Sequence, residues 1–305
     1  MLMHTLKLRS VAAAAGLVGA LTGCVDMTGP RLDASPVQPT TSSFREAFLG
    51  FQGYQFANLG GGDYTRLASI YMQQMAGTGR QWLTLDAPFL NDEGQFGSWN
   101  SFYTNGGLID IRKARQLAAA AGDRKYVGVT QVWEALVMSY VADFWGDAPY
   151  RQANRPGEPG ALDPQRQIYG DLQVLLDSAI TNLGQPGVAS DAWDLVYGGD
   201  AAQWRRAARS LKARLFLRTA NVDASALAAA LTNAQQGILT QADNFTTYQS
   251  TTAGEENTWF QFRRGRGTDI LAGAFLVNLL RTRNDPRLTQ YFANAGTTGA
   301  VAGAT

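Results

Sequence analysis

The strongest constraint on the fold is a segment near the middle of the chain that repeats large side chains with the period of an α-helix. Successive members lie three or four positions apart: Tyr126, Thr130, Trp133, Val137, Tyr140 and Phe144. Val129, Val132 and Leu136 widen this stripe, which is typical of a helix packed against neighbours on more than one side. Such a helix cannot remain in water alone, so the fold must supply helices before and after it.

The segment before it supplies one such helix. Residues 108–121 have a helical, alanine-rich pattern, and Gly122 and Asp123 follow at once. Glycine favours a helix end, and an aspartate can accept hydrogen bonds from the first free amides of the next helix. The pattern therefore predicts a tight helix–turn–helix pair.

Further helices are predicted after the central one. Asp163 and Pro164 indicate a cap and a first helical turn. The helix that follows would bury Ile168, Leu172, Leu175, Leu176, Ala179 and Ile180. Another begins near residue 202 and would turn inward Trp204, Ala208, Leu211 and Leu215. A shorter alanine-rich helix follows from Asp223.

The predicted architecture is mainly α, with helix pairs stacked as in an α-solenoid and with loop-rich insertions. No clean repeat period is present, so the TPR signature is absent as a sequence pattern. A short strand within residues 244–262 is the one β element expected. Arg205, Arg209 and Lys212 lie on one side of the helix near residue 202. They could face phosphate, but a solvated or carboxylate-paired face is the favoured interpretation.

The first residues have the parts of a lipoprotein export signal. Lys7 and Arg9 precede an apolar run over residues 11–21, which is shorter than the roughly 20 residues needed to span a bilayer. Leu21, Thr22 and Gly23 then precede Cys24 as in a lipobox. We therefore expect a signal peptide over residues 1–23, acylation of Cys24, a lipid-anchored flexible tether over residues 24–42 and a helical domain over residues 43–305.

Removal of that signal excludes several kinds of catalysis. The single histidine is His4 and the single cysteine is Cys24, so the exported chain would have no histidine and no free thiol. Ser-His-Asp and Cys-His catalysis, histidine-ligated zinc and histidine-ligated haem are thereby excluded. No Walker-type phosphate loop is present. Carboxylate chemistry and oxygen-ligated metals remain, although residues 91–94 lack the spaced carboxylates of an EF-hand and fit a surface turn better. No cofactor and no metal are expected.

The charge balance excludes a further class of partner. The chain has 26 basic and 25 acidic residues, and two of the basic ones, Lys7 and Arg9, lie in the predicted signal. Because binding to nucleic acid depends on a surplus of basic residues, no nucleic-acid partner is expected.

Four segments, in this order, resemble one protein family. They are VADFWGDAPY (141–150), DPQRQIYGDLQVLLDSAITNL (163–183), AAQWRRAARSLKARLFLRTA (201–220) and NDPRLTQYF (284–292). Together, behind a lipobox, they resemble the SusD/RagB-like outer-membrane lipoproteins over roughly residues 44–292. The family's aromatic turn reads Phe-Gly-Asp-x-Pro, and here Trp145 is inserted between Phe144 and Gly146.

The resemblance implies a SusD-like fold of TPR-like helix pairs, lipid-anchored in the outer membrane and facing the cell surface. It also implies a SusC-like TonB-dependent transporter barrel as partner and a glycan or another oligomeric nutrient as ligand. Family members continue beyond the point where this chain stops, and residues 294–305 fit an exposed loop. We therefore expect the helical domain to be incomplete at its C-terminus.

Two loop-like stretches have the residues that hold sugars, namely flat aromatics for stacking and amides or charged groups for hydroxyls. They cover residues 81–100 and 255–264. The candidate ligand residues are Trp82, Trp99, Asn100 and Trp259. Trp99 fits equally well as the first buried residue of the helix that follows it.

The aromatic turn at residues 141–150 also has two interpretations. Phe144 and Trp145 end the central helix, Gly146 permits a turn and Pro149 fixes it. One of the aromatics could face a ligand. A clamp onto the following helix pair is favoured, because Phe144 continues the predicted buried stripe.

Three functions remain open at this stage. The first is a binding module that captures a nutrient for a transporter. The second is a glycosidase, which needs two carboxylates about 5 Å or about 6.5–9.5 Å apart; its candidates, Asp92, Glu93, Asp143 and Asp147, show no spacing that singles out a pair. The third is a helical-repeat adaptor that binds only protein.

Overall fold

The computed structural model describes residues 41–85, 98–154 and 160–292. Its chain forms two contact units, Met1–Ser43 and Phe44–Thr305, and every described helix and strand belongs to the second. The predicted signal peptide, Cys24, nearly all of the tether, the turn at residues 91–94 and residues 294–305 lie outside the described residues.

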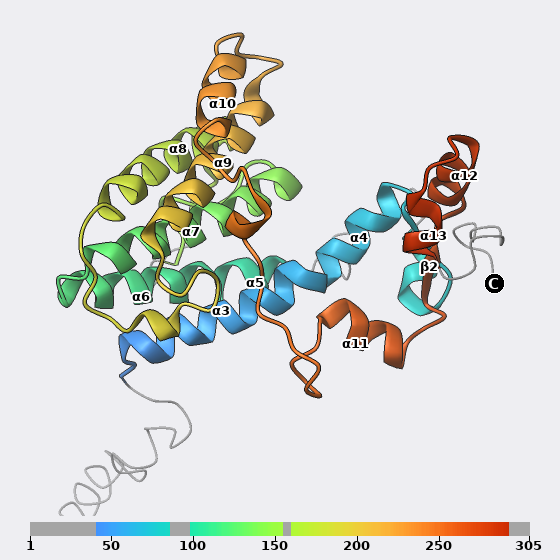
Figure 1. Ribbon diagram of the computed structural model, residues 1–305, viewed down its shortest axis with the longest axis horizontal. Helices are drawn as coiled ribbons and strands as arrows, with labels where there is room; N and C mark the ends of the chain where they lie inside the picture. The colour runs from blue at the N-terminus through green and yellow to red at the C-terminus, as the bar shows by residue number, and fades with distance from the viewer. Residues whose placement is uncertain (1–40, 86–97, 155–159, 293–305) are drawn as a thin grey trace, which may run out of the picture. The chain divides into compact units, whose positions relative to one another are not determined.

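The described chain is mainly helical, as predicted (Figure 1). Its α-helices are α3 (Phe44–Gly61), α4 (Asp63–Tyr71), α5 (Ser98–Tyr103), α6 (Leu108–Ala120), α7 (Arg124–Trp145), α8 (Gln165–Asn182), α9 (Ala201–Thr219), α10 (Ala226–Ala234), α11 (Thr258–Gly265), α12 (Ala274–Thr282) and α13 (Arg287–Tyr291). Short 3-10 helices are η1 (Arg80–Thr84), η2 (Asp191–Trp193) and η3 (Gln241–Asp243). Strand β1 (Met75–Gly77) pairs antiparallel with β2 (Ile270–Ala272).

The strand expected within residues 244–262 is wrong, because the end of that stretch starts helix α11 instead. The side chain of Asn257 accepts hydrogen bonds from the backbone amides of Trp259, at 2.8 Å, and Phe260, at 3.4 Å. This cap satisfies the first free amides and so favours a helix at this point.

Helices α6 to α10 contact one another in chain order, which is the stacking expected of helix pairs (Figure 1). α3 packs along α6, and α7 also contacts α5 and α9. Among the described residues, no helix is both long enough and apolar enough to cross a membrane.

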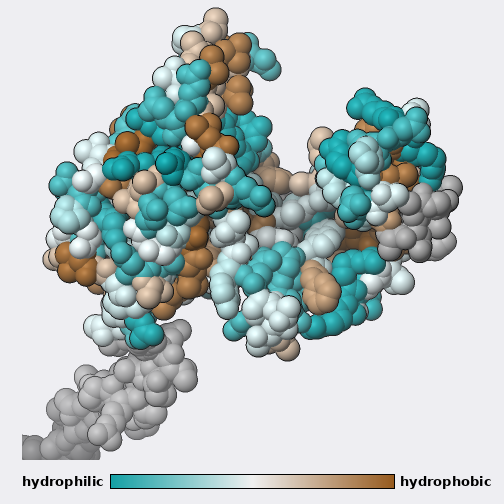
Figure 2. Space-filling model, viewed as in Figure 1, coloured by the Kyte–Doolittle hydropathy of each residue, from teal (hydrophilic) through white to brown (hydrophobic). Residues whose placement is uncertain are grey.

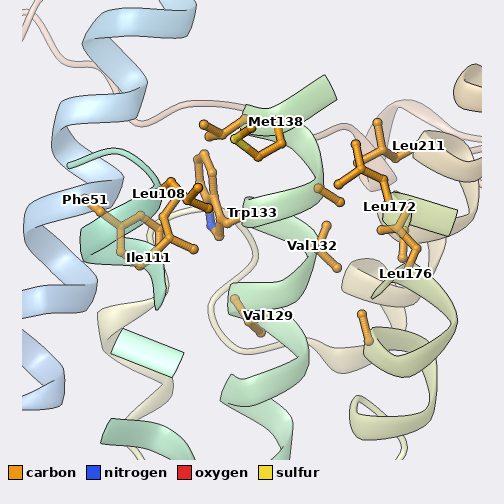
Figure 3. Close-up of a cluster of buried hydrophobic side chains, with 14 of the residues drawn as sticks. Phe51, Leu108, Ile111, Val129, Val132, Trp133, Met138, Leu172, Leu176 and Leu211 are labelled. Atoms are coloured by element: carbon orange, nitrogen blue, oxygen red, sulfur yellow. The ribbon is translucent and has the colours of Figure 1, made fainter. Parts of the chain in front are cut away.

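The main core surrounds α7, whose stripe is buried as predicted from Tyr126 to Val137. Figure 3 shows Trp133 of α7 between residues of α3 and α6 on one side and those of α8 and α9 on the other. Burial of each large apolar side chain contributes roughly 1.5–3 kcal/mol to folding. The prediction for Phe144 is wrong, because its side chain is 37% exposed. Its ring instead lies edge-on against Tyr64 of α4, at 5.4 Å between centroids.

The predicted turn between α6 and α7 is confirmed. Gly122 has a φ of +72°, and the Asp123 carboxylate accepts a hydrogen bond from the Tyr126 amide at 3.0 Å. The same carboxylate also accepts bonds from the amides of Val188, at 2.8 Å, and Ala189, at 2.6 Å. One buried aspartate therefore both starts α7 and holds the segment that follows α8.

The aromatic turn after α7 clamps that helix to the start of α8. Backbone bonds join Ala148 and Asp163 in both directions, at 3.1 and 2.9 Å. The Asp147 carboxylate accepts a bond from the Gln165 amide at 2.8 Å. The predicted capping role of Asp163 is therefore wrong, since Asp147 caps α8 while the Asp163 carboxylate accepts bonds from the amides of Tyr150 and Arg151.

Trp145 is the aromatic that anchors this turn. Its ring lies edge-on to Trp99, at 5.1 Å, and to Phe102, at 5.6 Å. The turn is thus held to α8 by polar bonds, whereas Trp145 packs on α5, which precedes α7. The predicted aromatic clamp onto the following helix pair is therefore wrong in its partner.

A second, smaller hydrophobic cluster joins segments far apart in the sequence. α4, β1, η1, α11 and β2 contribute to it. Its members are Leu67, Ile70, Trp82, Leu85 and Ile270, with Met75, Trp259 and Phe262 packed against them.

The face of the molecule in Figure 2 carries many polar side chains, with apolar side chains at separate places. Leu227 and Leu231 are exposed one helical turn apart on α10. The basic side of α9 is partly paired, as the favoured interpretation predicted: Lys212 is buried and lies 2.7 Å from the Asp177 carboxylate.

Candidate functional site

A pocket of about 310 Å³ lies where α3, α4, α5 and α11 meet, and we call it the polar pocket. Its lining combines an aromatic ring, an amide, hydroxyls and a charged pair: Tyr54, Ala57, Asn58, Gly61, Gly62, Asp63, Arg66, Ser101 and Thr258. These are the kinds of groups that bind a ligand rich in hydroxyls.

Glycines at the corner between α3 and α4 bring the walls of this pocket together. A Cβ on Gly61 would lie 2.6 Å from the backbone nitrogen of Trp259, at the start of α11. A Cβ on Gly62 would lie 2.6 Å from the carbonyl oxygen of Asn58. Both distances are too short for a real side chain, so the approach of α11 to α3 requires glycine at position 61 and the tight corner after α3 requires glycine at position 62.

The charged pair at the pocket is held in a defined orientation. Arg66 Nη1 donates a hydrogen bond to Asp63 Oδ1 at 2.6 Å. The Arg66 guanidinium carbon lies 4.2 Å from the centroid of the Phe262 ring and 5.7 Å from that of Trp259. Burial lowers the pKa of Arg66 from its ordinary value, and the Asp63 charge opposes this effect. The Asp63 side chain remains 66% exposed, so its carboxylate can still accept bonds from a ligand.

The neutral polar groups are fixed by bonds within the protein. Ser101 Oγ donates to Asn58 Oδ1 at 3.3 Å, and Asn58 Nδ2 donates to Gln55 Oε1 at 3.2 Å. Thr258 Oγ1 donates to the carbonyl of Ala57 at 2.9 Å. These groups therefore need little reorganisation when a ligand binds.

Two of the four predicted ligand residues, Trp82 and Trp259, belong to the second hydrophobic cluster, and Trp82 is shielded from solvent there. Trp82 lies in η1, is 4% exposed and packs edge-on against Phe262 at 5.8 Å. Trp259 is half-buried and stacks on the same Phe262 ring at 6.0 Å. Trp82 offers no open face for stacking in this structure, whereas Trp259 adjoins the polar pocket through Thr258 and Arg66.

The other two predicted residues lie in α5. Trp99 is half-buried against Tyr103, at 4.8 Å, and Trp145. Asn100 is exposed and immediately precedes Ser101, which lines the polar pocket. Thr258 of the second predicted stretch lines the polar pocket. Of the described residues of the first stretch, 81–100, none lines it, although Ser101, the next residue, does. A ligand role for Trp82, Trp99, Asn100 and Trp259 stays a prediction.

Sequence reasoning missed Asn58, Asp63 and Arg66, which line the pocket. The available signal was the run of Gly60, Gly61 and Gly62 before Asp63, since consecutive glycines mark a corner where backbones can approach closely.

The described acidic residues offered for a glycosidase are engaged in structural bonds. Asp143 accepts bonds from Arg218 Nη2, at 2.7 Å, and from the Tyr169 hydroxyl, at 2.8 Å. Asp147 caps α8. Asp92 and Glu93 lie outside the described residues.

The described carboxyl groups whose pKa is shifted are also unsuited to acid catalysis. Hydrogen bonds lower the pKa of Asp223 and Glu256, and those from Arg287 lower the pKa of Asp285 to about 2. A general acid of a glycosidase needs a raised pKa instead. Within the described part of the chain, no group of three or more His, Cys, Asp or Glu side chains is placed to hold a metal ion.

Comparison with solved structures shows the same helical fold. A SusD/RagB family protein from Bacteroides thetaiotaomicron is 25% identical, with a TM-score of 0.75, and the match covers 81% of this chain and 53% of that one. A chitin-binding protein is 21% identical, with a TM-score of 0.67 and coverage of 79% and 54%. The chain thus spans about half the length of these structures.

Among curated proteins, none matches the sequence. A family model described as starch-binding and associating with the outer membrane matches residues 41–304. Since this match extends over most of the sequence and the helical fold agrees with it, the chain belongs to the SusD-like family.

Proposed function

We propose that this protein is a lipid-anchored, surface-facing outer-membrane protein that binds a glycan or another oligomeric nutrient and delivers it to a SusC-like TonB-dependent transporter. The observation that carries the proposal is the polar pocket, with its fixed hydroxyl, amide, carboxylate and guanidinium groups. The family description as starch-binding and the chitin-binding relative support a glycan as the ligand class.

The geometry of the pocket suits one unit of a longer chain of sugars. Its volume of about 310 Å³ is at the lower end of the roughly 300–1,000 Å³ typical of small-molecule pockets. Asp63 can accept bonds from sugar hydroxyls, Arg66 can donate to their oxygens, and the half-exposed ring of Tyr54 offers a face for stacking. The rest of the ligand would extend over the surrounding surface.

Binding without cleavage is favoured over a glycosidase because Asp143 and Asp147 are committed to structural bonds. An adaptor that binds only protein remains the other alternative. The polar pocket does not support this alternative, because its lining consists mainly of polar groups and small residues.

The test is calorimetric titration of purified protein with maltoheptaose and chitohexaose, with a parallel assay for released reducing ends. We expect binding of at least one oligosaccharide without any release. Asp63→Asn should weaken that binding roughly tenfold, as for the loss of one charge-assisted hydrogen bond. Asp171→Asn, on the distant surface of α8, is the matched control and should leave affinity unchanged.

Release of reducing ends would show that binding is not the whole function. Equal affinity of the Asp63→Asn variant and the unmodified protein would remove the polar pocket from the proposal. Failure of all oligosaccharides to bind, together with co-purification of a transporter barrel, would favour the adaptor.

A further inference from the structure

A second and larger pocket, of about 620 Å³, lies among α7, α9, the end of α3 and the segment at residues 238–247. We call it the apolar pocket, because most of its wall consists of hydrophobic side chains. These hydrophobic side chains include Leu59, Val132, Leu136, Leu211, Ile238 and Phe245. It shares no lining residue with the polar pocket. Its volume lies within the usual range for small-molecule sites.

Among the described residues that line the apolar pocket, Arg214 is the one with a permanent charge. Its guanidinium carbon lies 5.0 Å from the centroid of the Tyr140 ring, which also lines the pocket. The stacked ring holds the guanidinium in place. A fixed cation therefore lies at the wall of a mainly hydrophobic space.

The nearest carboxylate only partly neutralises Arg214. Asp143 accepts bonds from Arg218 Nε, at 3.1 Å, from Arg218 Nη2, at 2.7 Å, and from the Tyr169 hydroxyl. Arg214 Nη2 lies 3.4 Å from the same carboxylate and is thus the weaker of its two arginine partners. Two arginines share one carboxylate, so one positive charge is left over, and Arg214 is the member that lines the pocket.

We propose that the apolar pocket binds an amphipathic anion, with its apolar body between the hydrophobic walls and its carboxylate, sulfate or sulfonate group on Arg214. The Arg214 side chain is 38% exposed, and a neutral apolar ligand would cover part of it without supplying an anionic partner. A fully polar anion would gain nothing from the hydrophobic walls. An amphipathic anion has both the apolar body that fits the hydrophobic walls and the charge that pairs with Arg214. The proposal for this pocket does not depend on the proposed glycan function.

The arrangement predicts opposite effects of two neighbouring substitutions. Removing the Asp143 charge leaves Arg214 without its anionic partner, so Asp143→Asn should tighten anion binding. Removing Arg218 makes Arg214 the main partner of Asp143, so Arg218→Gln should weaken it. A site that held its ligands by hydrophobic contact alone would show neither effect.

The experiment uses two fluorescent probes that differ only in one anionic group, 1-anilinonaphthalene-8-sulfonate and N-phenyl-1-naphthylamine. We expect the sulfonate to bind the full chain saturably, at one site, and roughly tenfold more tightly than the neutral amine. Arg214→Gln should remove that difference and leave binding of the amine unchanged, and Arg214→Lys should restore part of it. Ala207→Phe, which fills the pocket, should weaken both probes.

Asp63→Asn in the polar pocket is the matched control and should change neither probe. Circular dichroism melting checks that each variant is folded. Because partly unfolded protein also binds the sulfonate, the tightening expected for Asp143→Asn counts only if binding stays saturable at one site and binding of the neutral amine does not rise. The proposal is overturned if both probes bind equally to the unmodified protein, if Arg214→Gln leaves sulfonate affinity unchanged, or if Asp143→Asn weakens it.

Discussion

Glu134 is the most deeply placed carboxylate with two cationic partners in the described core. Its side chain is 2% exposed and lies 3.0 Å from Arg112 Nη2 and 2.5 Å from Arg115 Nη1. Arg112 also donates to the carbonyl of Tyr150 at 3.1 Å. Because Glu134 belongs to α7 and both arginines belong to α6, the cluster fixes how these two helices face each other.

We predict that Glu134→Gln destabilises the protein by about 3 kcal/mol, the lower end of the range for a broken buried ion pair. The lower end applies because both arginine side chains keep some contact with water. The measurement is the free energy of unfolding in urea. Asp171→Asn, which breaks an exposed pair with Arg151, is the control and should cause little change. An equal loss in both variants would contradict a special role for Glu134.

At the residue scale, local patterns were predictable and distant partners were not. Asp123 was identified as a cap because its partner, the Tyr126 amide, is three positions away. The cap of α8 was assigned to Asp163, next to the helix, whereas the structure uses Asp147, 18 positions before Gln165. The sequence shows where a helix needs a cap, but the residue that caps it depends on how the chain folds back.

At the element scale, the turn after α7 determines where α8 begins. Gly146, with a φ of +76°, turns the chain, Trp145 anchors it in the core and Asp147 presents its carboxylate to the first free amide of α8. The element is therefore a joint between two consecutive helix pairs. Its aromatic residues serve packing first.

We predict that Asp147→Ala lowers the free energy of unfolding by about 1 kcal/mol, as for the loss of a helix N-cap. Asp147→Asn retains an acceptor oxygen and should recover most of the loss. Chemical denaturation of the three proteins under one set of conditions provides the comparison. If the alanine and asparagine variants were equally destabilised, the carboxylate would act through its charge and not as a cap.

The helices themselves were the most predictable elements. α6, α7 and α9 have long apolar stripes, and the structure places them close to the expected positions. The strand expected at residues 244–262 was wrong because the end of this stretch forms helix α11, whose first amides are capped by Asn257. Short elements depend on one or two bonds, so periodicity carries little information about them.

At the scale of the whole molecule, the polar pocket depends on contacts between very distant parts of the chain. Thr258 donates its hydroxyl bond to Ala57, and Ser101 bonds to Asn58. Residues 255–264 were chosen from composition and supply Thr258 to this pocket, whereas Ser101 lies just beyond the other chosen stretch, residues 81–100. The corner between α3 and α4 was missed although the run of Gly60, Gly61 and Gly62 marks it, because glycines indicate a corner without showing which distant segments meet there.

The proposed membrane anchor gives a prediction at the same scale. Cys24 lies outside the described residues, so its acylation rests on the sequence alone. We predict that the protein expressed with its leader enters the detergent phase of a Triton X-114 partition, and that Cys24→Ser shifts it to the aqueous phase. Two acyl chains at about 0.8 kcal/mol per buried methylene are ample for stable anchoring. Recovery of the unmodified protein with a bare thiol in the aqueous phase would reject the anchor.

The glycine corner between α3 and α4 restricts how this pocket can diversify. A methyl group on Gly61 would occupy the space of the Trp259 backbone, so even alanine there would force α11 away from α3 and separate Thr258 from Ala57. Related proteins with the same crossing should therefore differ in ligand preference through the rim positions Tyr54, Asp63 and Arg66, while the crossing itself tolerates no enlargement. Selection for a new ligand would therefore change these rim residues and conserve Gly61.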